Sequence, residues 1–241
     1  MFMTKWLILL MLPLQLFAFN LKDEIKKAQK GDFIVYSYKQ SLVLLRVAGL
    51  AENELVIEEV SGPLHSIEQK NWQEWLQNGA PLHTSWTIST IDIANGKVRS
   101  IFSIDEKKYL NSNPSLQFLP TLLQLSFHTI DPAERKMVGA APLPGEIDTR
   151  HLWLPKIVFQ GKQIHPFIAA YKVFWPKDES ELAGKALDLY FAEKEALSYL
   201  PYWIEVASGV TKAKILALDS GKQLASPHTV ETYEQPQKVA L

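Results

Sequence analysis

The chain has 241 residues, 47% of them hydrophobic, and its 25 basic and 26 acidic side chains leave a formal net charge of −1. This length is sufficient for a stable core, and the balanced charge without long runs of one sign argues against nucleic acid or an acidic membrane surface as the main partner. The absence of cysteine excludes a lipid-modified cysteine, disulfides, thiolate metal sites and cysteine nucleophiles.

The chain begins with an apolar run, Trp6–Phe17, which follows Lys5 and is closed by the small residue Ala18. A positive start, a short apolar stretch and a small residue at the cleavage point define a secretory signal. The run is shorter than the roughly 20 residues that a membrane-spanning helix needs. We therefore expect a signal peptide over residues 1–18, no stable membrane span after its removal, and an exported protein that is periplasmic or secreted. The alternatives are an uncleaved anchor and a buried first helix.

The next elements are a short helix and three strands. Asn20 is suited to cap the helix, because its side chain can accept a hydrogen bond from the first turn. The runs Phe33–Lys39, Leu42–Ala48 and Glu54–Val60 are strand-like and are separated by gaps of hairpin length. The second run opens with four apolar residues, Leu42–Leu45. This pattern indicates a strand that is covered on both faces or that lines an enclosed apolar space.

Two further helices are expected in the first half of the chain. One runs from about Glu68 to Asn78, where Ser66 and Gln69 have the spacing of a capping box. The other lies between Ser115 and Leu125, where leucines recur at helical spacing. These two segments and the helix after Asn20 bring the expected number to two or three helices.

The clearest local signal is a β-hairpin formed by Ser85–Ile93 and Lys97–Ile104. Asn95-Gly96 lies between these runs and tolerates the positive φ of a tight turn. The proline-rich segment Gly139–Pro155 predicts a long connection between the two halves of the chain. Period-two patterns in the second half predict strands at Phe167–Trp175, Lys185–Phe191, Tyr202–Ser208 and Thr211–Leu218.

These elements predict an α+β fold with one domain over residues 19–224. The domain consists of a curved, half-barrel-like antiparallel sheet of about nine to eleven strands and two or three helices. Composition does not change across the central connection, which favours one domain over two. Residues 225–241 are polar and contain two prolines, so a flexible C-terminal tail is expected.

The sequence contains no recognisable catalytic, metal or nucleotide motif, and it predicts no cofactor. No two of the six histidines are three or four positions apart, so no helical metal pair exists. The nucleophile elbow, the phosphate-binding loop and the dinucleotide glycine pattern are also absent. These absences favour a non-enzymatic protein.

The nearest approach to a reactive cluster lies in the proline-rich connection. Carboxylates near an imidazole position or charge it for acid–base work, but polar residues in a solvated loop are the more common case, and a binding contact is a further alternative. The loop residues that are candidates for an interaction are Asp148, Arg150, His151 and Trp153.

Large aromatic and aliphatic side chains on the strands form a second group of candidates. Tryptophan and tyrosine near strand ends line apolar ligand pockets, and they also serve simply as large core residues. The candidates for a ligand cavity are Leu42, Leu44, Trp86, Tyr171, Trp175 and Trp203.

The stretch Tyr199–Val206 and the following run Lys212–Leu218 are similar in style to late strands of LolA/LolB-like periplasmic lipoprotein carriers. The order of elements resembles this class too: a signal peptide, a leading helix, an early meander, a covering helix and C-terminal hairpins. The resemblance implies a curved sheet that wraps helices and encloses a cavity for acyl chains. The stretch Pro201–Glu205 also resembles an uncharacterised family of bacterial secreted proteins.

Three functional hypotheses follow. The first is an exported, non-enzymatic carrier of an apolar, lipid-like small molecule or of a lipidated partner. The second is a secreted interaction or envelope-structural module that uses a sheet edge or the loop Gly139–Pro155. The third is a hydrolase centred on His151. An enclosed cavity would favour the carrier, and an exposed apolar patch would favour the interaction module. A carboxylate that is hydrogen-bonded to His151 would favour the hydrolase.

Overall fold

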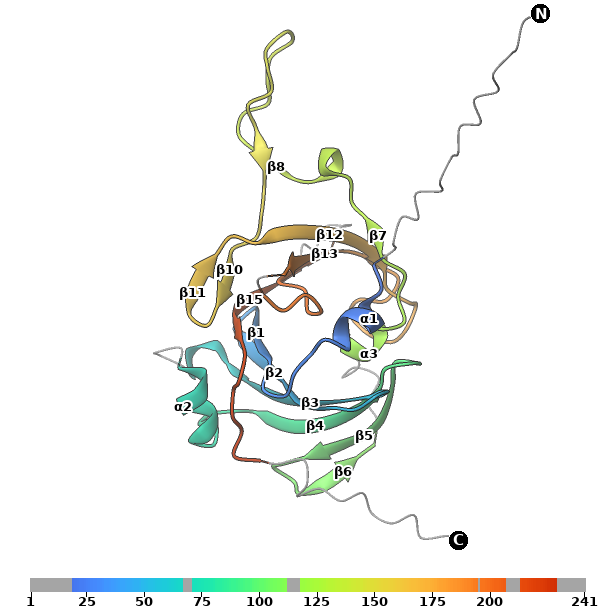
Figure 1. Ribbon diagram of the computed structural model, residues 1–241, viewed down its shortest axis with the longest axis vertical. Coiled ribbons are helices and arrows are strands. Elements are labelled where there is room, and N and C mark those ends of the chain that lie inside the picture. Colours follow the sequence, from blue (N-terminus) through green and yellow to red (C-terminus); the bar gives the residue numbers. More distant parts are fainter. Residues whose placement is uncertain (1–18, 67–70, 112–117, 195, 207–212, 229–241) are drawn as a thin grey trace, which may run out of the picture.

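The computed structural model describes residues 19–66, 71–111, 118–194, 196–206 and 213–228. Its main feature is an eleven-stranded antiparallel sheet in the order β6-β5-β4-β3-β2-β1-β15-β14-β13-β12-β7, which curves round without closing (Figure 1). The expected signal peptide, residues 1–18, lies outside the described residues, as does 229–241 of the expected tail.

The first half of the sheet is a meander in chain order. Its strands are β1 Phe33–Tyr38, β2 Ser41–Leu50, β3 Glu54–Pro63, β4 Ser85–Asp92, β5 Lys97–Ser103 and β6 Lys108–Leu110. The five predicted strands of the early meander and of the hairpin are confirmed, and Gly96 has the positive φ of 63° that the turn requires. The short strand β6 carries too few residues for a periodic pattern and was not predicted.

The second half of the sheet consists of β7 and four later strands. They are β7 His128–Thr129, β12 Phe167–Phe174, β13 Ala186–Glu193, β14 Trp203–Val206 and β15 Lys214–Gly221. The last strand, β15, pairs with the first strand, β1, so the two halves meet in the middle of the sheet. Residues 207–212, where the predicted strands Tyr202–Ser208 and Thr211–Leu218 meet, lie outside the described residues.

Two small hairpins lie at and after the predicted connection Gly139–Pro155. They are β8 Met137–Val138 with β9 His151–Leu152, and β10 Ile157–Phe159 with β11 Lys162–Ile164. The segment between β8 and β9 projects away from the sheet (Figure 1). Two turns of 3-10 helix, Leu64–Ser66 and Pro132–Glu134, complete the described elements.

The helices are shorter than their patterns predict. They are α1 Leu21–Ile25, α2 Trp72–Gln77 and α3 Phe118–Leu122. Asn20 caps α1 as expected, by accepting a hydrogen bond from the backbone N–H of Lys22. The capping box predicted for α2 is wrong, because Asn71 caps this helix through the backbone N–H of Glu74. None of the described helices is long and apolar enough to cross a membrane.

The sheet is covered on both faces in its first half. Helices α1 and α3 lie on the concave side, and α2 lies on the outer side (Figure 1). Strand β2 sends Leu45 and Val47 into the inner cluster and Leu42 and Leu44 into the outer cluster. The prediction that this strand is covered on both sides is therefore confirmed, and the fold is a sheet-dominated α+β domain.

Candidate functional site

A cleft at the open end of the concave face, here called the rim pocket, has a volume of about 410 Å³. Its lining includes Phe19, Tyr171 and Phe191. The ring of Phe19 stacks on Tyr171 with centroids 4.4 Å apart, and it lies 5.0 Å from the rings of both Phe127 and Phe191. Four aromatic rings from four separate segments of the chain therefore build one apolar wall.

The position of Phe19 in this wall is set by the helix that follows it. Asn20 caps α1, and Leu21 and Ile25 of α1 are buried in the inner core. This anchoring holds the residue immediately before the cap against the end of β12 and β13. The wall thus depends on the N-terminal end of the described chain.

Charged side chains surround the aromatic wall. Glu24, Lys27, Glu193 and Lys194 all line the rim pocket. Lys27 Nζ lies 2.5 Å from Glu24 Oε1, so these two charges largely neutralise each other. Burial raises the pKa of the Tyr171 phenol, with smaller contributions from the carboxylates of Glu193 and Glu24. The phenol therefore remains protonated at neutral pH and can donate a hydrogen bond.

The predicted ligand-cavity residues do not converge on one site. Leu42, Leu44 and Trp86 belong to the outer cluster, whereas Tyr171 and Trp175 pack with the inner cluster. Trp203 packs in a third cluster, outside the other two. Among these residues, Tyr171 alone lines the rim pocket. The sequence did not single out the three phenylalanines of the wall, because their proximity depends on folding.

The concave face behind the rim pocket is filled by the inner core. A much smaller cavity of about 50 Å³ lies beneath α3, and its lining includes Glu59, Leu45 and Leu119. Burial raises the pKa of Glu59. Within the described residues, the Glu59 side chain forms no hydrogen bond or ion pair. This space is too small for a lipid chain unless α3 moves.

The segment between β8 and β9, residues 139–150, forms an arm that projects from the body (Figure 1). Its apolar residues Leu143 and Ile147 are 67% and 87% exposed. At its base, Trp153 packs against Trp203 with ring centroids 4.6 Å apart, and the ammonium of Lys136 lies over the Trp153 ring. The arm is therefore anchored by aromatic packing and is apolar near its tip.

The charged residues of the arm pair with one another. Arg150 Nη2 lies 2.7 Å from Asp148 Oδ2, and the hydrogen bonds from Arg150 lower the pKa of Asp148 to about 2. The His151 ring has no hydrogen bond or ion pair within the described part of the chain. The carboxylate that was expected to orient a catalytic histidine is thus engaged by arginine instead.

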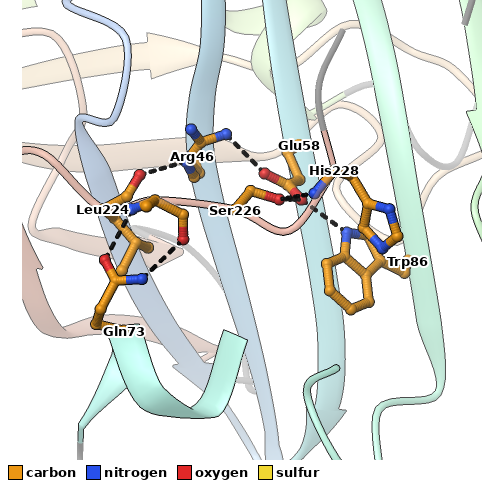
Figure 2. Close-up of polar contacts among 8 residues, drawn as sticks. Arg46, Glu58, Gln73, Trp86, Leu224, Ser226 and His228 are labelled. Atoms are coloured by element: carbon orange, nitrogen blue, oxygen red, sulfur yellow. Dashed lines mark hydrogen bonds and ion pairs between the residues drawn. The ribbon is translucent and has the colours of Figure 1, made fainter. Parts of the chain in front are cut away.

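The outer face carries a network of polar contacts beneath residues Leu224–His228, here called the strap (Figure 2). Arg46 Nε donates a hydrogen bond to the carbonyl oxygen of Leu224 at 2.6 Å, and Arg46 Nη1 lies 2.8 Å from Glu58 Oε2. The hydroxyl of Ser226 donates to Glu58 Oε1 at 2.6 Å. Residues 225–228, which the sequence assigns to a flexible tail, therefore contact the domain.

The titratable side chains of the described residues do not assemble into a metal site. No group of three or more histidine, aspartate or glutamate side chains able to hold a metal ion occurs among them. The surface features described above are the rim pocket, the arm and the polar contacts beneath the strap.

Residues 43–165 match the family described as CT021 protein. The chain belongs to the CT021 family. A similar solved structure is that of the hypothetical protein CT021 from Chlamydia trachomatis, with a TM-score of 0.62 and 19% sequence identity. The alignment covers 91% of this chain and 98% of that chain, and at this identity the likeness shows a shared fold. A comparison with curated proteins finds no match.

The part of the chain that matches the CT021 family, residues 43–165, runs from β2 to β11. It includes the arm and the outer-face residues Arg46 and Glu58. The rim-pocket residues Tyr171 and Phe191 and the strap lie beyond it. The family match therefore includes none of the residues that line the rim pocket, and it includes the outer-face residues beneath the strap but not the strap itself.

Proposed function

We propose that this CT021-family protein is an exported, non-enzymatic binding protein for a single-chain amphipathic molecule. The apolar tail of the ligand lies in the rim pocket, and its polar head lies among the charged residues at the mouth. The observation that carries the proposal is the aromatic wall of Phe19, Phe127, Tyr171 and Phe191 beside a cleft of about 410 Å³.

The size and lining of the cleft support a small apolar ligand. Ligand pockets typically have volumes of about 300–1,000 Å³ and combine apolar walls with a few polar groups. In the rim pocket, aromatic rings supply the apolar wall, and the Tyr171 hydroxyl supplies a donor. Burial of an acyl chain against such a wall is favourable by roughly 0.8 kcal/mol per methylene group.

The charges at the mouth favour a polar head group without a strong net charge. The Lys27–Glu24 pair is also bonded to the Ser198 hydroxyl, which donates to Glu24 Oε2 at 2.7 Å. Lys194 and Glu193 carry opposite charges, so together they add no net charge to the pocket lining. A monoacylglycerol fits this environment better than a strongly anionic lipid.

The architecture supports the same class of function. The unclosed, curved sheet with α1 and α3 on its concave side supports the half-barrel-like arrangement that the resemblance to LolA/LolB-like carriers implies (Figure 1). The interior is filled by packed side chains, so a ligand inside the sheet would require α3 to move out of the core. The rim pocket accepts an acyl chain without that cost.

The decisive experiment is native mass spectrometry with lipid extraction on protein purified from its own envelope, followed by titration with monolauroylglycerol. Ala169 lines the rim pocket, so Ala169→Phe should fill the cleft and abolish binding. Ala51→Phe, at an exposed position after β2, is the matched control and should bind normally. Absence of a co-purifying lipid together with equal titration of both variants would rule out the proposal.

The arm supports a second candidate function, a protein-interaction module. Leu143 and Ile147 are large apolar residues that are more than half exposed, and such residues in proximity mark contact surfaces. Replacing both with aspartate should leave the free energy of unfolding nearly unchanged and should abolish capture of a partner by the intact protein. Unchanged capture would exclude the arm as the interface.

A further inference from the structure

We propose that the outer face of the sheet carries a groove that binds an extended peptide, and that the strap Leu224–His228 occupies it as a tethered ligand. The peptide that fits has a branched aliphatic residue followed, two positions later, by a residue with a hydroxyl group. This site is separate from the rim pocket, and the inference does not depend on the proposed lipid ligand.

The first part of the groove is an apolar subsite for the Leu224 side chain. Leu224 is 4% exposed and packs into the outer cluster together with Trp72, Trp75 and Trp86. Two of these tryptophans come from α2, and the third comes from β4. The subsite is therefore built by the body of the domain, and the strap contributes only the leucine that fills it.

The second part is a clamp on the strap backbone. The Gln73 side chain accepts a hydrogen bond from Ala225 N at 2.8 Å and donates one to Ala225 O at 3.0 Å (Figure 2). Arg46 Nε holds the preceding carbonyl, that of Leu224. A side chain that binds both the backbone N–H and the backbone C=O of one residue recognises an extended backbone irrespective of its side chains.

The third part of the groove is a carboxylate that selects a peptide side chain with a hydroxyl group. Glu58 is fully buried and accepts hydrogen bonds from Arg46 Nη1 at 2.8 Å and from Trp86 Nε1 at 2.9 Å. Its oxygen Oε1 also accepts the Ser226 hydroxyl at 2.6 Å (Figure 2). A residue without a donor at this position would leave a buried carboxylate with one partner fewer, which is unfavourable.

The strap can leave the groove without disrupting the sheet. Strand β15 ends at Gly221, and Gln223 has a positive φ of 62°, so the chain turns sharply before the strap begins. One backbone hydrogen bond to the body, from Leu224 N to Gly31 O at 2.9 Å, accompanies the side-chain contacts described above. None of the strap residues belongs to a described strand. Displacement of the strap therefore breaks no strand pairing of the described sheet.

The close approach of Gln223, the residue before the strap, also explains a glycine in the body of the domain. Gly31 has a φ of 91°, and a Cβ at this position would lie 2.9 Å from the Cα of Gln223. Only glycine combines this conformation with such a short separation from another backbone. The body is thus adapted to a chain segment that enters the groove at this point.

The test uses the full chain, with a variant that weakens the binding of the strap to the groove and leaves the groove residues unchanged. Leu224→Asp places a charge in the apolar subsite and should release the strap, while every groove residue is retained. The synthetic peptide Lys-Gln-Leu-Ala-Ser-Pro-His is then titrated while the fluorescence of the buried tryptophans is recorded. A tethered ligand competes at an effective concentration of about millimolar, so the variant should bind the peptide at least about tenfold more tightly than the wild type.

Two control peptides and one groove variant define the site. Replacing leucine by aspartate, or serine by alanine, in the peptide should weaken binding strongly. Adding Gln73→Ala to the Leu224→Asp chain should weaken binding of the original peptide. Equal binding of all three peptides, or equal binding by the wild type and Leu224→Asp, would overturn the proposal because the peptide would then bind elsewhere.

A second variant keeps the test valid if Leu224→Asp fails to fold. Ala225→Pro removes the N–H that donates to Gln73, and it introduces no charge. Amide hydrogen exchange of the strap shows whether it has been released. A folded variant with a released strap that does not bind the peptide at millimolar concentration also overturns the proposal.

Discussion

Arg46 and Glu58 are direct partners on adjacent strands β2 and β3, and their charged atoms lie 2.8 Å apart with side chains 6% and 0% exposed. The pair lies on the outer face, where the rest of the neighbouring cluster is apolar. Removal of two charges from water is costly, so the pair is stable only because each partner is satisfied by the other and by further hydrogen bonds. The strap supplies two of those bonds, through the Leu224 carbonyl and the Ser226 hydroxyl.

The first prediction concerns the coupling within this pair. Arg46→Met and Glu58→Leu, made separately, should each lower the free energy of unfolding by about 3–5 kcal/mol, because each leaves one buried charge without its partner. The double variant should lose less than the sum of the two, and urea denaturation of the four proteins measures the difference. Strict additivity would show that the pair is not energetically coupled.

The second prediction concerns the indole of Trp86. Trp86→Phe keeps an aromatic ring but removes the N–H that donates to Glu58, and it should lower the free energy of unfolding by about 1–3 kcal/mol. Trp153→Phe is the control, because the Trp153 indole N–H makes no hydrogen bond within the described residues. Chemical denaturation should show a clearly smaller loss for the control, and equal losses would contradict this account.

The third prediction concerns the turn of the early hairpin. Gly96 has a φ of 63°, and a Cβ there would lie 2.6 Å from the carbonyl oxygen of Pro120 in α3. Gly96→Ala should therefore cost more than the roughly 1 kcal/mol of left-handed backbone strain alone. Gly161→Ala provides the comparison, because its φ is 74° and nothing lies within 4 Å of the added Cβ. Thermal denaturation should rank Gly96→Ala as the more destabilising, and the reverse order would contradict the packing of the turn on α3.

The fourth prediction concerns the stability of the protein at alkaline pH. Burial raises the pKa of Tyr202 to about 12, and burial also raises the pKa values of Tyr36 and Tyr199. An unfolded tyrosine has a pKa of about 10, so the folded state retains these protons when the unfolded state loses them. Stability is therefore intact below about pH 10 and falls as the pH rises toward 12.

Phenolate absorbance and circular dichroism, recorded together, test this expectation. The three tyrosines should ionise as the fold is lost, and Tyr202→Phe should make the loss of stability with rising pH less steep. Ionisation of all tyrosines near pH 10 in a still-folded protein would refute it. The hydroxyl of Tyr202 bonds to Ser220 at 2.7 Å, so Tyr202→Phe should also lower stability modestly at neutral pH.

The sequence by itself determined the local elements of this protein. Strand-like runs at hairpin spacing predicted β1 to β5. Period-two patterns predicted β12 to β15, because a strand with one face toward a core shows a period of two. Asn20 and Asn95-Gly96 predicted a helix start and a turn through backbone chemistry that is independent of distant residues. The helix ends were less accurate, since Asn71 and tertiary packing, rather than the capping box, determine where α2 begins.

Only the tertiary structure decided where these elements meet. The pairing of β1 with β15 joins residues near the two ends of the domain, and no local pattern encodes such a contact. The same limitation applies to the rim pocket, where Phe19 meets Tyr171 and Phe191, and to the strap, where Ser226 meets Glu58. The physical reason is that the periodicity of apolar residues and the capping residues of helices depend only on the structure of their own segment. Its partners across the sheet are selected by the packing of the whole chain.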